Sequence, residues 1–121
     1  MAVRVLVVDD HETFRRAARA VIEETDGFEL AGEAADGEAS VEAAQSLKPD
    51  IVLMDINLPG ISGIEATRRI LAVLPRTMVL LLSTRDGFEL ADQAARCGAA
   101  AYLPKSRLSP GHLTQLWAAA R

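Results

Sequence analysis

Cysteine and aromatic residues are scarce in this sequence of 121 residues. The one cysteine, Cys97, excludes an internal disulfide, which fits a protein of a reducing compartment. Phenylalanine, tryptophan and tyrosine make up only 4% of the chain, so its core must be built from valine, leucine, isoleucine and alanine. The length suits one domain and leaves little room for a second.

An excess of positive charge and long apolar runs are also lacking. Lysine and arginine together number 13 against 17 acidic residues, which gives a formal net charge of −4. Nucleic acids and anionic membranes are bound by clustered lysine and arginine, so we expect neither as a partner. The opening apolar run, residues 5–8, ends in two aspartates and is far shorter than the roughly 20 residues of a membrane helix. We expect a soluble, cytoplasmic protein.

Short apolar runs alternate with helical patterns along the chain. The runs are brief, have polar ends and several are β-branched, which indicates buried strands at residues 3–8, 28–32, 51–54, 78–82 and 99–103. Apolar residues at the spacing of one helix face predict helices around residues 14–22, 66–74 and 113–120. Five such strand and helix units in series predict an α/β fold, a parallel sheet with helices on both faces.

Polar side chains cluster at the predicted strand ends. The first strand is followed by two aspartates, the third by one, the fourth by a serine, and a lysine lies just beyond the fifth: Asp9, Asp10, Asp55, Ser83 and Lys105. The carboxyl ends of parallel strands share one edge of a sheet, where such folds bind ligands. We therefore expect these side chains to converge.

Converging carboxylates repel one another and attract a cation. Two unit charges about 4 Å apart repel by about 4 kcal/mol at an effective dielectric constant of about 20. Protonation or a hard cation would relieve this repulsion, and oxygen ligands without a nearby histidine or cysteine favour Mg²⁺. Beside Mg²⁺ one carboxylate could attack a phosphoryl group. Lys105 and Ser83 would then contact the phosphoryl oxygens.

Four segments of the chain carry a family resemblance: VLVVDDH at 5–11, DIVLMDINLPGISG at 50–63, LLST at 81–84 and YLPKS at 102–106. In this order and spacing they resemble the receiver domain of bacterial two-component response regulators, particularly the NarL/FixJ-type subfamily with a helix-turn-helix output. The resemblance covers residues 1–121 as one receiver domain without an output domain. It implies a flavodoxin-like (β/α)5 three-layer sandwich with strand order 2-1-3-4-5.

The resemblance also implies a role for each site residue. Asp55 would accept a phosphoryl group from a histidine kinase, which makes the chain a regulatory phosphoacceptor and not an enzyme. Mg²⁺ would be held by Asp9, Asp10, Asp55 and the backbone carbonyl of Asn57. Lys105 would contact the phosphoryl group, with Ser83 as the switch hydroxyl and Tyr102 as the switch aromatic. Ser83 is preferred to Thr84 because it ends the apolar run and its spacing from Lys105 matches the family.

Several competing interpretations remain open at this stage. A haloacid-dehalogenase-type phosphohydrolase would need Asp-x-Asp after the first strand and a cap domain, and a dinucleotide-binding module would need Gly-x-Gly-x-x-Gly there. A receiver that serves only as a scaffold would lack some of the five strand-end residues, and none is missing. We expect the chain to be part of a longer regulator that dimerises on phosphorylation; the alternative is a stand-alone receiver that docks onto a partner protein.

Individual residues also have plainer interpretations. Asp9 and Asp10 could cap the first helix, Tyr102 could be a core tyrosine, and His11 is expected to be solvated. Gly63 should permit a close approach at the start of the third helix. Many receivers have Lys-Pro where this chain has Lys105-Ser106; here the proline precedes the lysine. We expect a trans peptide bond after Lys105, since a non-proline cis bond costs about 2.5–4 kcal/mol. We also expect the fifth strand at an edge of the sheet, since its proline has no N–H group to donate to a neighbouring strand.

Overall fold

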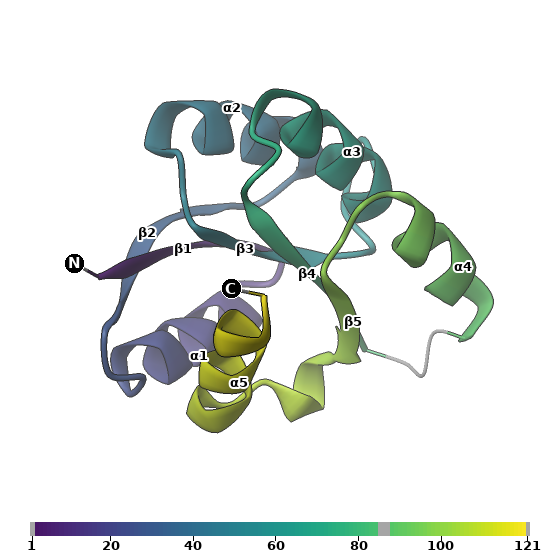
Figure 1. Cartoon of the computed structure of the whole chain (residues 1–121). Coiled ribbons are helices and arrows are strands. Elements are labelled where there is room, and N and C mark those ends of the chain that lie inside the picture. The colour runs from purple at the N-terminus through teal and green to yellow at the C-terminus, as the bar shows by residue number, and fades with distance from the viewer. Residues whose placement is uncertain (1, 85–87, 121) are drawn as a thin grey trace.

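The computed structural model describes residues 2–84 and 88–120, and these form one parallel sheet between two layers of helices (Figure 1). The strands are β1 (Val3–Val8), β2 (Phe28–Ala34), β3 (Ile51–Asp55), β4 (Met78–Ser83) and β5 (Ala101–Pro104). Their order in the sheet is β2-β1-β3-β4-β5. This is the order that the family resemblance implies, so the fold prediction is confirmed.

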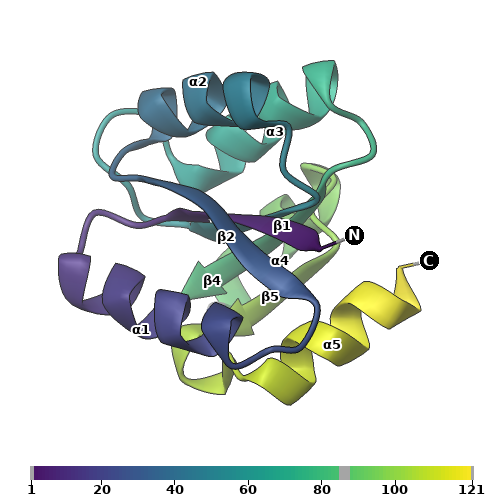
Figure 2. The ribbon, with the colours of Figure 1, turned by 90° about the vertical axis from the view of Figure 1, so that its left-hand side faces the viewer.

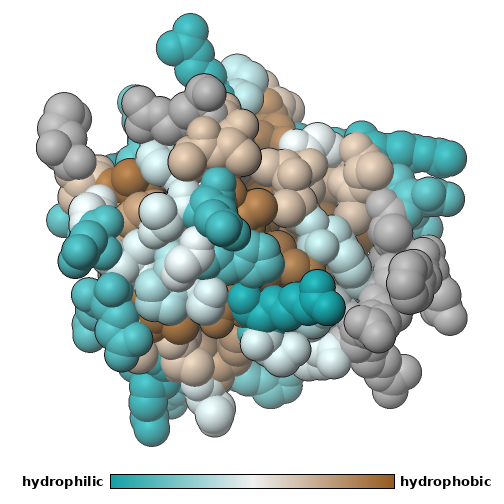
Figure 3. Space-filling model, turned by 60° about the horizontal axis from the view of Figure 1, so that its bottom comes forward, coloured by the Kyte–Doolittle hydropathy of each residue, from teal (hydrophilic) through white to brown (hydrophobic). Residues whose placement is uncertain are grey.

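Helices follow the strands in alternation. They are α1 (Glu12–Glu23), α2 (Gly37–Leu47), α3 (Gly63–Val73), α4 (Phe88–Arg96) and α5 (Pro110–Ala119), with a 3₁₀ turn η1 (Lys105–Arg107) before α5. Helices α1 and α5 cover one face of the sheet, and α2 and α3 cover the other (Figures 1 and 2). Hydrophilic side chains cover much of the outer surface on the α1 and α5 side, with hydrophobic atoms between them (Figure 3).

Two apolar clusters hold the helices to the sheet. Successive side chains of a strand point to opposite faces, and in β1 Leu6 packs into the α2 and α3 side while Val5 and Val7 pack into the α1 and α5 side. On the first side Ile70 of α3 is fully buried, and on the second Ile22 of α1 is fully buried. Strand β3 is buried along its whole length, as a central parallel strand requires. The strand carboxyl ends are thereby fixed at one edge.

The bounds of β2 and β5 differ most from the sequence prediction, whereas β3 and β4 each end only one residue later than predicted. β2 continues to Ala34 because it follows β1 past a register shift between Val5 and Leu6 and pairs to the end of that strand. β5 begins at Ala101, two residues later than predicted, and includes Pro104, which lies opposite Ser83 of β4. The edge position of β5 is confirmed. None of the described peptide bonds is cis, as expected after Lys105.

The thiol of Cys97 and the character of the helices were both subjects of the sequence predictions. Cys97 is a free thiol, buried just after α4, and its Sγ lies 3.1 Å from the carbonyl oxygen of Ala94. It behaves as a small apolar residue of the core. No helix in the described part of the chain is long and apolar enough to cross a lipid bilayer.

Candidate functional site

Four ligand-bearing side chains meet where β1 and β3 end. β1 pairs with β3 up to Val8 and Met54, so the residues that follow β1 lie beside Asp55, the last residue of β3. The possible ligand atoms of Asp9, Asp10, His11 and Asp55 all lie within 4.8 Å of one another. The convergence predicted for the three carboxylates is therefore present in the structure.

Lys105 reaches this cluster from the end of β5. Its Nζ lies 2.5 Å from Oδ2 of Asp9 and 3.5 Å from Oδ2 of Asp55. The side chain of Asp9 is fully buried and only 12% of the lysine side chain is exposed. The ammonium also lies 4.7 Å from the centre of the Phe14 ring, a cation–π contact. The sequence placed Phe14 on the apolar face of α1 but gave no sign of this contact.

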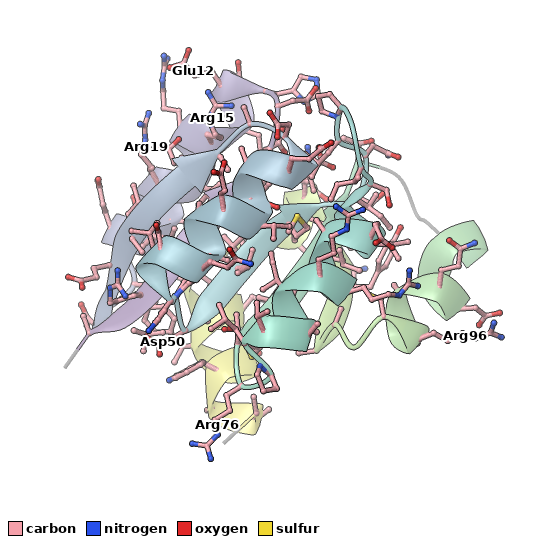
Figure 4. All side chains as sticks on the ribbon, turned by 90° about the horizontal axis from the view of Figure 1, so that it is seen from above. Glu12, Arg15, Arg19, Asp50, Arg76 and Arg96 are labelled. Carbon is pink, nitrogen blue, oxygen red and sulfur yellow. The ribbon has the colours of Figure 1, made fainter. Side chains whose placement is uncertain are left out.

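The backbone of Asp9 is held by two hydrogen bonds. Its N–H donates to the carbonyl of Ala34 at 3.0 Å, and its carbonyl accepts from Nη1 of Arg15 at 2.7 Å. Arg15, which Figure 4 labels, also donates through Nε to Oε1 of Glu33 at 3.2 Å, and this bond ties α1 to β2. Sequence reasoning missed both residues, because a charged pair between an exposed helix and a strand has no local pattern. The pair fixes the segment that carries the first two aspartates.

The capping interpretation of the two aspartates does not fit this geometry. The residue that caps α1 is His11, and its side chain makes no capping hydrogen bond. Oδ1 of Asp9 accepts from the backbone N–H of His11 itself, at 2.8 Å. The carboxylate thus orders the turn before the helix and does not bond to the first-turn N–H groups that a capping side chain would satisfy.

The environment of Asp55 disfavours a negative charge. Burial raises the pKa of its carboxyl group, and repulsion from Asp9 raises it further. The backbone N–H of Asn57, 3.2 Å from Oδ1, and the ammonium of Lys105 act against this rise in pKa. The net direction is upward. A cation bound between these carboxylates would stabilise their charged forms and so oppose this rise in pKa.

The loop after β3 is held tightly against Asp55. The N–H of Gly63 donates to the carbonyl of Ile56 at 3.0 Å, and a Cβ on Gly63 would lie 2.1 Å from the carbonyl oxygen of Asp55. The predicted close approach at the start of α3 is confirmed. Glu38 of α2 supports the same loop, since its Oε1 accepts from the N–H of Ile61 at 3.2 Å. No local sequence pattern indicates the Glu38 contact.

The premise that no histidine lies near the carboxylates is wrong. His11 Nδ1 lies 3.1 Å from Oδ1 of Asp9 and 3.1 Å from Oδ1 of Asp10. Its side chain is 66% exposed, so it is solvated as expected. The extended backbone of this residue (φ −99°, ψ 116°) nevertheless leaves the ring beside the carboxylates. The sequence showed this histidine but not the direction of its ring.

The remaining predicted residues lie around this centre. Ser83 is the buried last residue of β4, next to the in-register pair Asp55 and Leu82, whereas Thr84 is exposed. The hydroxyl of Tyr102 is buried without a hydrogen-bond partner in the described part of the chain. A hollow of about 170 Å³ between α4 and β5 is lined by its ring and five alanines.

Most of the chain is similar to known proteins. Residues 5–117 match the response regulator receiver domain family. A protein-glutamate methylesterase/protein-glutamine glutaminase of Alkalilimnicola ehrlichii is 43% identical over 106 residues, which are 87% of this chain and 27% of that protein. YxjL, an uncharacterized transcriptional regulatory protein of Bacillus subtilis, is 38% identical over 119 residues, which are 98% of this chain and 55% of that protein.

The structure is also similar to solved structures. A LuxR-family two-component response regulator from Aurantimonas superposes with a TM-score of 0.88 at 36% identity, over 99% of this chain and 86% of that chain. The chain spans about half the length, or less, of the curated relatives that it matches.

Proposed function

Because this chain belongs to the receiver domain family of response regulators, we propose that it accepts a phosphoryl group on Asp55 from a histidine kinase, with Mg²⁺ bound beside it. The observation that carries the proposal is the meeting of Asp55 with two further carboxylates and the ammonium of Lys105 at one sheet edge. Mg²⁺ would be held by Asp9, Asp10, Asp55 and the backbone carbonyl of Asn57. When bound, it would neutralise the charge on the carboxylates and the phosphoryl oxygens.

The chemistry of the transfer is a displacement at phosphorus. An oxygen of Asp55 forms a bond to phosphorus while the bond from phosphorus to the donor nitrogen breaks, and the electron pair of that bond returns to the kinase histidine. The product is an acyl phosphate. Lys105 already lies 3.5 Å from Asp55, so its ammonium can follow the negative charge onto a phosphoryl oxygen. The buried setting strengthens this interaction because little water screens it.

The signal would be a change between two conformations. Phosphorylation must stabilise the active conformation by about 5.5 kcal/mol relative to the inactive one to raise its population from about 1% to about 99%. The phosphoryl group adds charge and acceptor oxygens, for which the buried Ser83 would be a donor. Tyr102 would respond by moving its ring, and the hollow of about 170 Å³ beside it offers room for that movement.

Labelling with a small phosphoryl donor tests the proposal. The chain, incubated with acetyl phosphate and Mg²⁺, is expected to gain the mass of one phosphoryl group, and Asp55→Asn should abolish this gain. Asp50→Asn is the matched control, because Asp50 lies at the opposite end of the sheet from Glu12 and the site (Figure 4). Full labelling of the Asp55→Asn protein would contradict the assignment of Asp55 as the phosphoryl acceptor. Hydrolysis of many molecules of a generic phosphate ester per chain would favour the alternative of a haloacid-dehalogenase-type phosphohydrolase.

Metal binding tests the ligand set separately. Asp10→Ala is expected to weaken Mg²⁺ binding far more than Glu12→Ala, because Asp10 belongs to the carboxylate cluster. Glu12 is exposed at the first turn of α1 (Figure 4). Calorimetric titration of both variants with Mg²⁺ measures the difference. Equal losses in the two variants would mean that Asp10 is not a metal ligand.

The proposal also covers the partners of the chain. The histidine kinase would act on it in the cytoplasm, and the rest of a longer regulator would carry the output, with transcription favoured by the YxjL relative. Phosphorylated chains would pair as homodimers, which sedimentation of the labelled sample tests.

With a net charge of −4 the receiver alone should not bind DNA. A band shift of this chain at physiological salt that survives competitor DNA would contradict that view.

A further inference from the structure

We propose that His11 gives the carboxylate cluster a nitrogen ligand, so that it binds divalent transition-metal ions such as Cu²⁺ and Ni²⁺. The inference deepens the metal site of the proposed function and concerns only which ions that site accepts. It starts from two contacts of one ring nitrogen: Nδ1 of His11 lies 3.1 Å from a carboxylate oxygen of Asp9 and 3.1 Å from one of Asp10. Possible donor atoms from three consecutive residues therefore lie within 4.8 Å of one another.

The spacing of these donors suits a shared metal ion. Ligand atoms about 2.1 Å from a six-coordinate ion lie about 3.0 Å apart when they are neighbours on the octahedron. The two separations of 3.1 Å agree with that edge. The fourth group of the cluster, Asp55, also has a carboxylate oxygen within 4.8 Å of the others. A metal could thus replace the direct contact between ring and carboxylates with little movement.

The three residues can keep this arrangement. Asp9 is fully buried and is tied by the backbone N–H of His11, by Arg15 and by the ammonium of Lys105. The side chains of Asp10 and His11 are more open, with 33% and 66% of their surfaces exposed, so an ion and its remaining water ligands can reach them from solvent. The site is rigid on its inner side and accessible on its outer side.

The donor chemistry decides which ions gain from the histidine. Mg²⁺ prefers oxygen ligands and gains little from imidazole, whereas Co²⁺, Ni²⁺, Cu²⁺ and Zn²⁺ bind imidazole well. For a given site of nitrogen and oxygen ligands, affinity rises from Co²⁺ through Ni²⁺ to Cu²⁺. His11 should therefore raise the affinity for these ions without raising the affinity for Mg²⁺. The two kinds of ion would compete for Asp10.

The experiment uses tag-free protein, because the chain has only two histidines. His11→Gln removes the proposed ligand, and His112→Gln is the matched control, since His112 lies on α5 with its Nδ1 3.0 Å from the carbonyl of Arg107. Calorimetry with Ni²⁺ and with Mg²⁺ gives both affinities for each protein. Pulsed electron paramagnetic resonance of one equivalent of Cu²⁺ then detects imidazole nitrogen directly.

We expect His11→Gln to weaken Ni²⁺ binding by about tenfold or more, and to change Mg²⁺ affinity much less; tenfold is about 1.4 kcal/mol. The imidazole couplings should be present in wild type and in His112→Gln and absent in His11→Gln. Unchanged couplings in His11→Gln, or an equal loss of Ni²⁺ and Mg²⁺ affinity, would overturn the inference. Phosphorylation of Asp55 by acetyl phosphate in the presence of Mg²⁺ is measured in a separate assay. Failure of the proposed phosphorylation can therefore be distinguished from failure of the proposed metal ligation by His11.

Discussion

Replacing Lys105 with methionine is expected to lower the free energy of unfolding by about 3–5 kcal/mol in metal-free buffer at neutral pH, because removal of one partner leaves a buried charge uncompensated. The ammonium lies within 3.5 Å of carboxylate oxygens of both Asp9 and Asp55, and these two side chains are almost fully buried. Methionine retains the length and apolar surface of the lysine stem. Urea denaturation followed by circular dichroism measures the loss.

The loss should depend on pH with a defined sign. Asp55 has a pKa raised above 3.8, so the metal-free protein loses stability as the pH rises from that value through the raised pKa. Lys105 opposes this shift, so the pKa of Asp55 should rise further in Lys105→Met. The difference between variant and wild type should therefore be largest at neutral pH and shrink in acid, where Asp55 is protonated.

Two comparisons isolate the buried charge as the cause. Lys48→Met replaces the other lysine of the chain, which is exposed, and should change stability by no more than about 0.5 kcal/mol. Saturating Mg²⁺ should restore part of the stability of Lys105→Met, because the ion supplies the missing positive charge. If Lys105→Met unfolds at the same urea concentration as wild type at neutral pH without metal, the ammonium does not stabilise the buried carboxylates.

Much of the fold could be predicted from local pattern, and the strand order required the family resemblance. The apolar run of β3 is short, buried and followed by Asp55, and the rule that parallel strands end at one edge brought that carboxylate to Asp9 and Asp10. Periodicity alone does not say that β3 lies beside β1. Helix α2 showed no helical apolar pattern because its buried residues are small: Gly37, Ser40 and Ala44.

The contacts that orient the site could not be predicted in the same way. The ring direction of His11, the position of Phe14 under Lys105 and the bond from Arg15 to the carbonyl of Asp9 depend on rotamers and on distances between elements. Sequence spacing fixes which face of an element a residue occupies, and this was right for Phe14. It does not fix which polar atom that residue meets.

Gly63→Ala is expected to lower the free energy of unfolding by about 3 kcal/mol, toward the upper end of what overpacking costs. The added Cβ would lie 2.1 Å from the carbonyl oxygen of Asp55 and 2.9 Å from two further backbone atoms of residues 55 and 56. These neighbours belong to the backbone at the end of a buried strand, and the N–H of Gly63 is itself bonded to the carbonyl of Ile56. Rotation of a side chain therefore cannot relieve the overlap.

The same substitution should slow the labelling of Asp55 in the fraction that folds, because α3 can move away only by displacing the backbone that carries this carboxylate. Gly111→Ala is the control: Gly111 lies in the first turn of α5, a Cβ there would meet nothing within 4 Å, and alanine favours a helix by up to about 1 kcal/mol. Urea denaturation and the acetyl phosphate assay on both variants give the two readouts. If Gly63→Ala were as stable as Gly111→Ala and labelled at the wild-type rate, the start of α3 would be free to shift without moving Asp55. The close approach would then have no part in positioning Asp55 for the proposed phosphoryl transfer.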